Sequence, residues 1–302
     1  MRKTIFGESV QGASHKRTGM ECQDSYKKIE CDDGTVILAV ADGHGSSSCP
    51  FSKTGSSIAV NVFCKVMEEF HDSYADNIEM LLTYLNREGD TKVAQAVDSE
   101  WKRRVLKIHT NNKRETPLLD DGEKNKQEIF RQYGTTLVGL MITPVFLFAF
   151  QIGDGDISYV DDNGFDQVLH TEKILGTETH SLSKIDSWKK AVSAVRRRDC
   201  SEDLPAAFLM STDGFANSYK NEDEFKKTCV EYYEMLKEHG ADAVNANLKE
   251  WLTETSEMGC GDDITLLIAY FSEDAAVEEE KLSISEVEVP TESEASKDEQ
   301  CE

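Results

Sequence analysis

The sequence predicts an α+β fold in which sheets pack together and helices lie outside them. A hydrophobic content of 39% supplies enough apolar material for a large core. Short apolar segments separated by tight turns predominate in the early and middle parts of the chain, and segments with helical periodicity occur in pairs. The 302 residues fit one large domain better than two, because no second compositional boundary divides the first 272 of them.

The individual elements follow from the spacing of apolar residues. Apolar runs bounded by turns predict strands at 35–41, 135–142, 145–152, 157–160, 165–170, 206–211 and 264–271. Apolar residues that recur every three or four positions predict helices at 52–70, 78–85, 93–108, 185–197, 222–238 and 241–257. Three consecutive arginines, at 196–198, would end one of these helices, where they suit the helix dipole.

Two segments differ from the rest of the chain in composition. Residues 109–132 are polar and rich in turn formers, so we expect a long surface insertion in the domain 1–272. Residues 273–302 carry twelve acidic side chains and two lysines, a net charge of −10, and no aromatic residue. This composition predicts a disordered tail. It could serve as an acidic docking or phospho-acceptor segment, but a solvating extension is the simpler interpretation.

The charge of the chain excludes several classes of protein. With 33 basic and 57 acidic residues the net charge is −24, which disfavours binding to nucleic acid or to anionic membrane surfaces. No apolar run of about 18 residues predicts a membrane span, and the N-terminus lacks the apolar region of a signal peptide. The eight cysteines are scattered without a CxxC pair, so we expect free thiols in a cytoplasmic protein.

Four aspartates lie at the ends of predicted strands and beside glycines: Asp42, Asp154, Asp213 and Asp262. Strand ends can direct several carboxylates toward one point, where their oxygens suit Mg²⁺ or Mn²⁺. A single Asp-Gly pair is only a common turn. Four carboxylates brought together without a cation would repel one another. They therefore either occupy separate surface turns or share metal ions.

Six short motifs follow one another along the chain, most of them at the ends of predicted strands: Cys22-Gln23-Asp24, Asp42-Gly43-His44-Gly45, Gly134-Thr135-Thr136, Gly153-Asp154-Gly155, Ser211-Thr212-Asp213-Gly214 and Gly261-Asp262-Asp263-Ile264-Thr265. In this order and strand context they resemble the metal-dependent protein phosphatases of type 2C. The sequence around them is more similar to a bacterial subgroup than to the animal or plant enzymes. The resemblance spans residues from about 7 to 271.

The resemblance implies a four-layer α-β-β-α sandwich with two central antiparallel sheets. It also implies two bound Mg²⁺ or Mn²⁺ ions and a third, weaker one. The implied metal ligands are Asp24, Asp42, the carbonyl of Gly43, Asp213 and Asp262, with Asp154 at the third ion. Gly134-Thr135-Thr136 would be a structural motif without chemistry.

The implied activity is hydrolysis of phosphoserine and phosphothreonine in proteins by a water activated between two metal ions. His44 would protonate the leaving oxygen. Arg17 is the first choice for binding the phosphate, and His15 is the reserve, because either can lie near the first acidic motif. The expected partners are a phosphorylated protein substrate and a cognate serine/threonine kinase, and the expected state is a monomer.

Two departures from the family pattern leave an alternative open. Gln23 stands where many relatives have Glu, and Asp263 stands where Asn is common. The first removes an anionic group and the second adds one. The alternative is a catalytically weak relative that binds phosphoproteins as a regulatory module.

Overall fold

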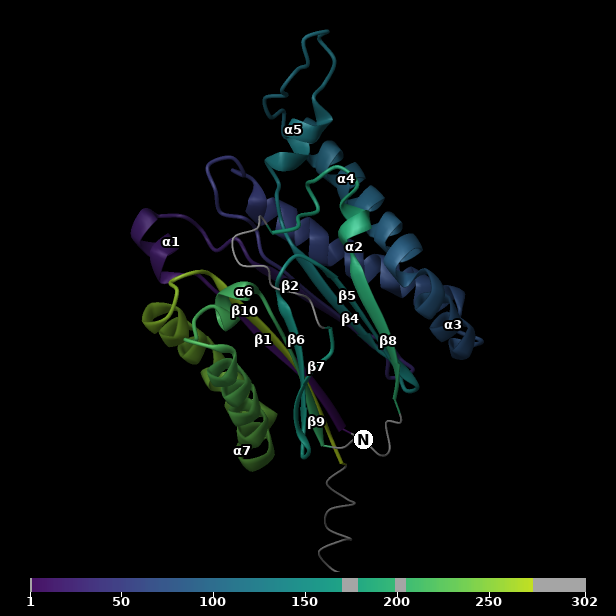
Figure 1. Cartoon of the computed structure of the whole chain (residues 1–302), viewed down its shortest axis with the longest axis vertical. Coiled ribbons are helices and arrows are strands. Elements are labelled where there is room, and N and C mark those ends of the chain that lie inside the picture. The colour runs from purple at the N-terminus through teal and green to yellow at the C-terminus, as the bar shows by residue number, and fades with distance from the viewer. Residues whose placement is uncertain (1, 170–178, 199–204, 274–302) are drawn as a thin grey trace, which may run out of the picture.

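In the computed structural model, which describes residues 2–169, 179–198 and 205–273, two five-stranded sheets stack face to face. Helices cover both outer faces, as Figure 1 shows. The strand orders are β1-β10-β9-β6-β7 and β2-β3-β4-β5-β8, and every pairing is antiparallel. This confirms the predicted α+β sandwich of four layers. The expected tail begins at the edge of the described residues, so its disorder remains a prediction.

The strands of the first sheet are β1 (Arg2–Val10), β10 (Ile264–Ser272), β9 (Ala206–Ser211), β6 (Asp156–Asp161) and β7 (Gly164–Gln167). Those of the second are β2 (Ser25–Glu30), β3 (Val36–Ala41), β4 (Leu137–Ile142), β5 (Phe146–Ile152) and β8 (Val192–Arg197). The helices are α1 (Ala13–Thr18), α2 (Ser52–Ser73), α3 (Ile78–Glu88), α4 (Ala94–Asn111), α5 (Lys126–Arg131), α6 (Asp213–Ala216) and α7 (Glu222–Met258), with a π turn at Gly89–Val93 and a 3₁₀ turn at Ser187–Lys190.

The buried strands are apolar on both faces because each sheet lies between another sheet and a helical layer. In β3, Ile37 and Ala39 pack with the core under α2 and α4, whereas Val36 and Leu38 face the other sheet. In β9 the same alternation places one set of side chains under α7 and the other between the sheets. Along each continuous apolar run, alternate residues therefore face the helices, and the residues between them face the other sheet.

Helix α2 lies very close to the turn that joins α5 to β4. A Cβ on Gly55 of α2 would lie 1.9 Å from the carbonyl oxygen of Tyr133, so only glycine fits there. Trp101 Nε1 of α4 also donates a hydrogen bond to the Gly55 carbonyl, at 3.0 Å. The insertion that follows α4 extends past α5 at the top of Figure 1.

The structure differs from the predicted elements in two places. Residues 185–197 form no helix: a short 3₁₀ turn leads into β8, which pairs with β5 from Gln151 to Phe146. The three arginines consequently lie at the end of a strand. Strands β1 and β2 are absent from the prediction because few of their residues are buried: three of nine in β1 and none in β2. The two predicted C-terminal helices are confirmed, because α7 consists of two helical segments that meet at Gly240, whose backbone is not helical (φ +80°, ψ 161°).

None of the helices that the structure describes combines the length and the apolar character that a bilayer crossing requires.

Candidate metal centre

Asp42 occupies the turn that follows the fully buried strand β3. Two threonines hold its backbone in place. The Asp42 amide donates to Thr136 Oγ1 at 3.0 Å, and its carbonyl accepts from the Thr136 amide at 2.9 Å and from Thr135 Oγ1 at 2.7 Å. Gly43, the next residue, forms an isolated antiparallel β-bridge with Thr135. The turn is thus fixed from the neighbouring strand, and its carboxylate has a defined position.

The Asp42 carboxyl lies among other carboxylates. Burial raises its pKa well above the usual value, and four nearby negative charges raise it further. Those charges belong to Asp24, Asp213, Asp262 and Asp154. The structure therefore brings all five predicted carboxylates into one electrostatic cluster, although their segments are up to about 240 residues apart in the chain.

Asp24 is the most deeply buried member of the cluster, with 1% of its surface exposed. Its Oδ2 accepts a hydrogen bond from Thr212 Oγ1 at 2.6 Å, but its Oδ1 is buried without a hydrogen-bond partner. Lys53 Nζ contacts the Asp24 backbone carbonyl, 2.6 Å away. Burial raises the pKa of the carboxyl to about 7, since interactions with the hydroxyls of Thr212 and Thr265 only partly offset the lost hydration.

Asp213 and Asp262 approach from the other sheet. Asp213 opens α6 directly after β9, and its Oδ2 accepts from Asn217 Nδ2 at 2.9 Å. Asp262 precedes β10 and is exposed to solvent. The two turns lie in close contact, because a Cβ on Gly214 would come within 2.1 Å of the Asp263 carbonyl oxygen. Glycine at this position lets the ends of β9 and β10 meet.

Asp154 lies in the turn between β5 and β6, half-buried, and its Oδ2 accepts from Thr179 Oγ1 at 2.7 Å. Gly153, with φ of +115°, precedes it, and a Cβ there would overlap Thr136. The threonine that fixes Asp42 therefore also limits the turn that carries Asp154.

Asp263 has a role that the sequence did not reveal. Its buried carboxylate accepts from the Gly12 amide at 2.6 Å through Oδ1 and from the Gln23 amide at 2.7 Å through Oδ2. His15 Nδ1 lies 2.9 Å from the same Oδ1. Asp263 thus anchors the N-terminal loop, which carries Asp24, to the start of the last strand. This role can be recognised only from the burial of the carboxylate and from the backbone amides around it, and neither is visible in the sequence.

The remaining predicted residues lie around the carboxylates. His44 follows Gly43, is half-buried, and donates through its backbone amide to the Gly134 carbonyl at 3.2 Å. Arg17 is exposed on α1, with Nη2 3.9 Å from the position of a Cβ on Gly261. His15 lies closer to the Asp42 turn: its Nε2 is 3.4 Å from the corresponding position on Gly45.

Gln23 contributes an amide where many relatives carry an acid. Its Oε1 accepts a hydrogen bond from Ser52 Oγ at the start of α2, and its backbone donates to Asp263. The side chain therefore joins the N-terminal loop to α2.

A divalent cation fits the chemistry of this cluster. Four other carboxylates act on Asp42 electrostatically, the pKa values of Asp24 and Asp42 are raised, and one buried oxygen of Asp24 has no hydrogen-bond partner, although no three of these described carboxylates have oxygens within 4.8 Å of one another. Carboxylate oxygens of this kind are the preferred ligands of Mg²⁺ and Mn²⁺.

A second set of ligand-type atoms lies away from the carboxylate cluster. Among the residues that the structure describes, Cys31, Asp33 and His71 alone form a group of three such atoms within 4.8 Å of one another. His71 Nε2 is 2.8 Å from Asp33 Oδ2, and Asp33 also accepts from the Thr35 amide. These contacts connect the β2–β3 turn to the end of α2.

Comparisons with known proteins identify the family and agree with the fold. The family model described as "Protein phosphatase 2C" matches residues 11–253. A serine/threonine phosphatase of S. agalactiae superposes with a TM-score of 0.56 at 15% identity, covering 90% of this chain and 100% of its own. The catalytic domain of the serine/threonine phosphatase PstP, in complex with two manganese ions, superposes with a TM-score of 0.53 at 14% identity. The match covers 90% of this chain and 99% of that domain. PppA of Pseudomonas aeruginosa superposes with a TM-score of 0.52 at 15% identity, and the match covers 90% of this chain and 99% of PppA. No curated protein sequence matches the chain.

Proposed function

The chain belongs to the protein phosphatase 2C family, and from this premise we propose that it hydrolyses phosphoserine and phosphothreonine in proteins at a centre of two divalent cations. The enzyme class is protein serine/threonine phosphatase, and the cofactor is Mg²⁺ or Mn²⁺. One observation carries the proposal: the Asp42 carboxyl lies among four other carboxylates at the edge where both sheets end. No observation on the described residues separately favours a regulatory binding module.

The proposed ligands are those whose side chains or carbonyls surround Asp42. Asp42 and the carbonyl of Gly43 would hold the ions from the turn that follows β3. Asp213 and Asp262 would hold one ion from the second sheet, and Asp24 would hold the other from the N-terminal loop. Asp154, at the rim, is proposed for a third ion. The unpartnered oxygen of Asp24 supports its inclusion.

When bound, the cations would lower the pKa of a water molecule and neutralise charge on the phosphoryl oxygens. The chain itself supplies the position of the carboxylates, through Thr135, Thr136 and Asp263, and the groups that act on the substrate. His44 is the proposed donor of a proton to the leaving serine or threonine oxygen, because it directly follows the Asp42-Gly43 turn.

Arg17 and His15 both remain proposed phosphate-binding residues. The geometry favours His15, since its Nδ1 lies 2.9 Å from the Asp263 carboxylate and its Nε2 lies against the Asp42–Gly45 turn. Arg17 is exposed and would have to reach over Gly261, but its planar guanidinium suits a phosphate better. Substituting each by alanine and comparing KM for a phosphopeptide would separate the two.

The proposal is tested by hydrolysis of p-nitrophenyl phosphate with Mn²⁺, with and without EDTA. We expect Asp42→Ala and Asp213→Ala to reduce turnover by at least about 100-fold while the circular dichroism spectrum is kept. Asp121→Ala is the matched control, because Asp121 also precedes a glycine but lies exposed in the insertion. Wild-type turnover in either ligand variant would show that the site is misassigned. A folded wild type without metal-dependent turnover that binds phosphopeptides would favour the regulatory module instead.

A further inference from the structure

A cavity of about 310 Å³ lies at the end of the sandwich opposite to Asp42. It is bounded by the start of β5, the end of β8, the β6–β7 hairpin and Phe208 of β9. Strand β5 runs from this cavity, at Phe146, to the turn of Asp154, so the two places are about 20 Å apart along the strand. The cavity is therefore separate from the proposed metal centre.

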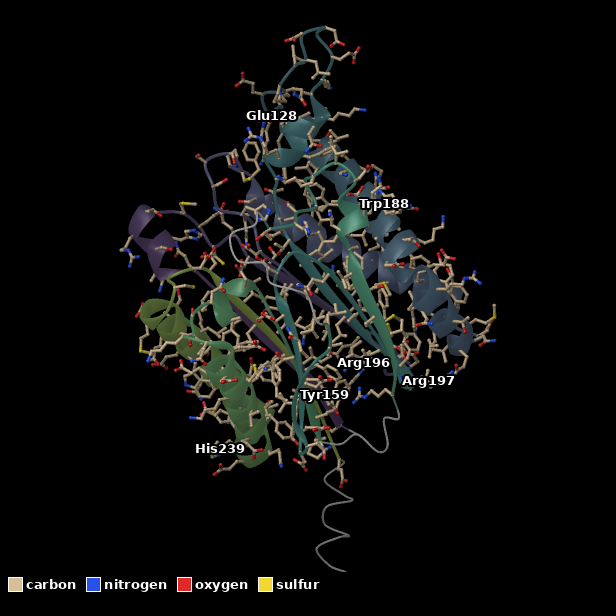
Figure 2. All side chains as sticks on the ribbon, viewed as in Figure 1. Glu128, Tyr159, Trp188, Arg196, Arg197 and His239 are labelled. Atoms are coloured by element: carbon tan, nitrogen blue, oxygen red, sulfur yellow. The ribbon has the colours of Figure 1, made fainter. Side chains whose placement is uncertain are left out.

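Three arginines line the cavity, and two of them are already paired. Arg196 contacts Asp166 Oδ2 at 2.5 Å and two backbone carbonyls at 3.0 Å. Arg197 forms a two-pronged contact with Glu79 of α3, at 2.8 and 3.0 Å. Figure 2 shows both side chains at the lower end of β8, in the region of Tyr159. Neither needs a further anion.

Arg198 differs from its neighbours. Only 7% of its surface is exposed, and none of its three guanidinium nitrogens has a hydrogen-bond partner. Its backbone is held by a hydrogen bond from its amide to the Val145 carbonyl at 3.0 Å. The guanidinium carbon lies 4.4 Å from the ring centre of Phe271 and 5.4 Å from that of Phe208, both on the opposite sheet.

Among the residues that the structure describes, no carboxylate pairs with the Arg198 guanidinium. Contacts with aromatic rings use the flat faces of a guanidinium and offset only part of the cost of burying a cation. Its N–H groups lie in the plane of the group, where they have no acceptor, and all three nitrogens are covered from solvent. Two acids line the cavity, and both are already engaged. Asp166 pairs with Arg196, and Asp161 accepts from Tyr159 Oη at 3.2 Å and from the Asn163 amide at 2.8 Å.

We propose that this cavity is an oxyanion-binding site in which Arg198 holds a phosphate group or a carboxylate. The planar fork of N–H groups matches two oxygens of either group, and Phe271 and Phe208 keep the fork in position. The anion has two available sources. One is a phosphate-type anion in solution. The other is a carboxylate of the acidic residues 273–302, which begin two positions after Phe271.

The test uses the full-length protein in EDTA, so that no metal centre binds the probe. Thermal unfolding is followed while sulfate replaces chloride at constant ionic strength. For the wild type we expect a saturable rise in melting temperature of about 3 °C. Arg197→Met, the matched control at the neighbouring position, should show the same rise. Arg198→Met should lose it and keep only the unsaturable effect that sulfate has on any protein.

The source of the anion is determined in a full-length variant with the twelve acids of residues 273–302 replaced by their amides. If the chain supplies the carboxylate, the wild type responds weakly to sulfate and this variant responds fully. If the anion comes from solution, both respond alike. Absence of an Arg198-dependent, saturable response in both backgrounds would overturn the proposal. If Arg198→Met fails to fold, Arg198→Lys replaces it: a smaller rise is expected, and a rise equal to that of the wild type would refute the role of the fork.

Discussion

Replacing Asp24 by Asn should stabilise the metal-free protein at high pH. Burial raises the pKa of this carboxyl from 3.8 to about 7, which is about three units, or ~4 kcal/mol at 1.36 kcal/mol per unit. Between these two values the folded protein keeps a proton that the unfolded chain releases, so the free energy of unfolding falls as pH rises. The cost is complete above pH 7 and vanishes below about pH 4.

The asparagine side chain removes this cost, and Thr212 can still donate to its amide oxygen. The new amide group itself costs about 1–2 kcal/mol of stability, because it takes the place of Oδ1, which has no hydrogen-bond partner, and is left without an acceptor. The net gain in EDTA at pH 8 is therefore about 2 kcal/mol, or roughly 3–4 °C in melting temperature for a domain of this size. At pH 4.5 the gain should be close to zero or negative.

Thermal unfolding of the wild type, Asp24→Asn and the exposed control Asp121→Asn, each at pH 4.5 and 8, measures this difference. The control should match the wild type at both values. With saturating Mn²⁺ the order should reverse, because only the wild type keeps the complete ligand set. An Asp24→Asn protein that melts below the wild type in EDTA at pH 8, or by the same offset at both pH values, would refute the reasoning.

Three further outcomes are expected. His44→Ala should reduce turnover of a phosphopeptide by about 100-fold or more but that of p-nitrophenyl phosphate much less, because the better leaving group needs little protonation; equal losses would argue against a proton donor. Asp263→Ala should cost about 2–4 kcal/mol in urea unfolding, since the buried amides of Gly12 and Gln23 lose their acceptor, and Asp262→Ala, its exposed neighbour, should not. Deleting residues 273–302 should leave kcat/KM for p-nitrophenyl phosphate unchanged, and a large loss would show that the segment belongs to the domain.

The sequence predicts the buried strands and the long helices well because their signals are local. Strand β9 has the predicted bounds, and β3 and β10 differ from theirs by one residue at one end. The prediction fails where tertiary contacts decide the structure. Strand β8 is half-exposed and gains its conformation from pairing with β5, whereas its sequence alone permits a helical interpretation.

The candidate site shows the same division. Four of the five aspartates could be found from the sequence, because each follows or precedes an apolar strand and adjoins a glycine, whereas Asp24 is implied only by the family resemblance. Their supports could not: Thr136, Thr212 and Asp263 act across elements distant in the chain, and their contacts depend on the register of the sheets. Arg198 was interpreted as part of a helix end, so its burial between the sheets had no signal in the sequence.

The position of β10 has a consequence for biosynthesis. This last strand lies between β1 and β9, with β1 formed from the first residues of the chain. A growing polypeptide therefore presents two open edges until residues 264–272 leave the ribosome, and Asp262 and Asp263 arrive at the same moment. Assembly of this sheet must therefore wait until β10 has been translated. A nascent chain that stopped at α7 would lack the hydrogen bonds of β10 to β1 and β9. It would also lack Asp262, one of the proposed metal ligands.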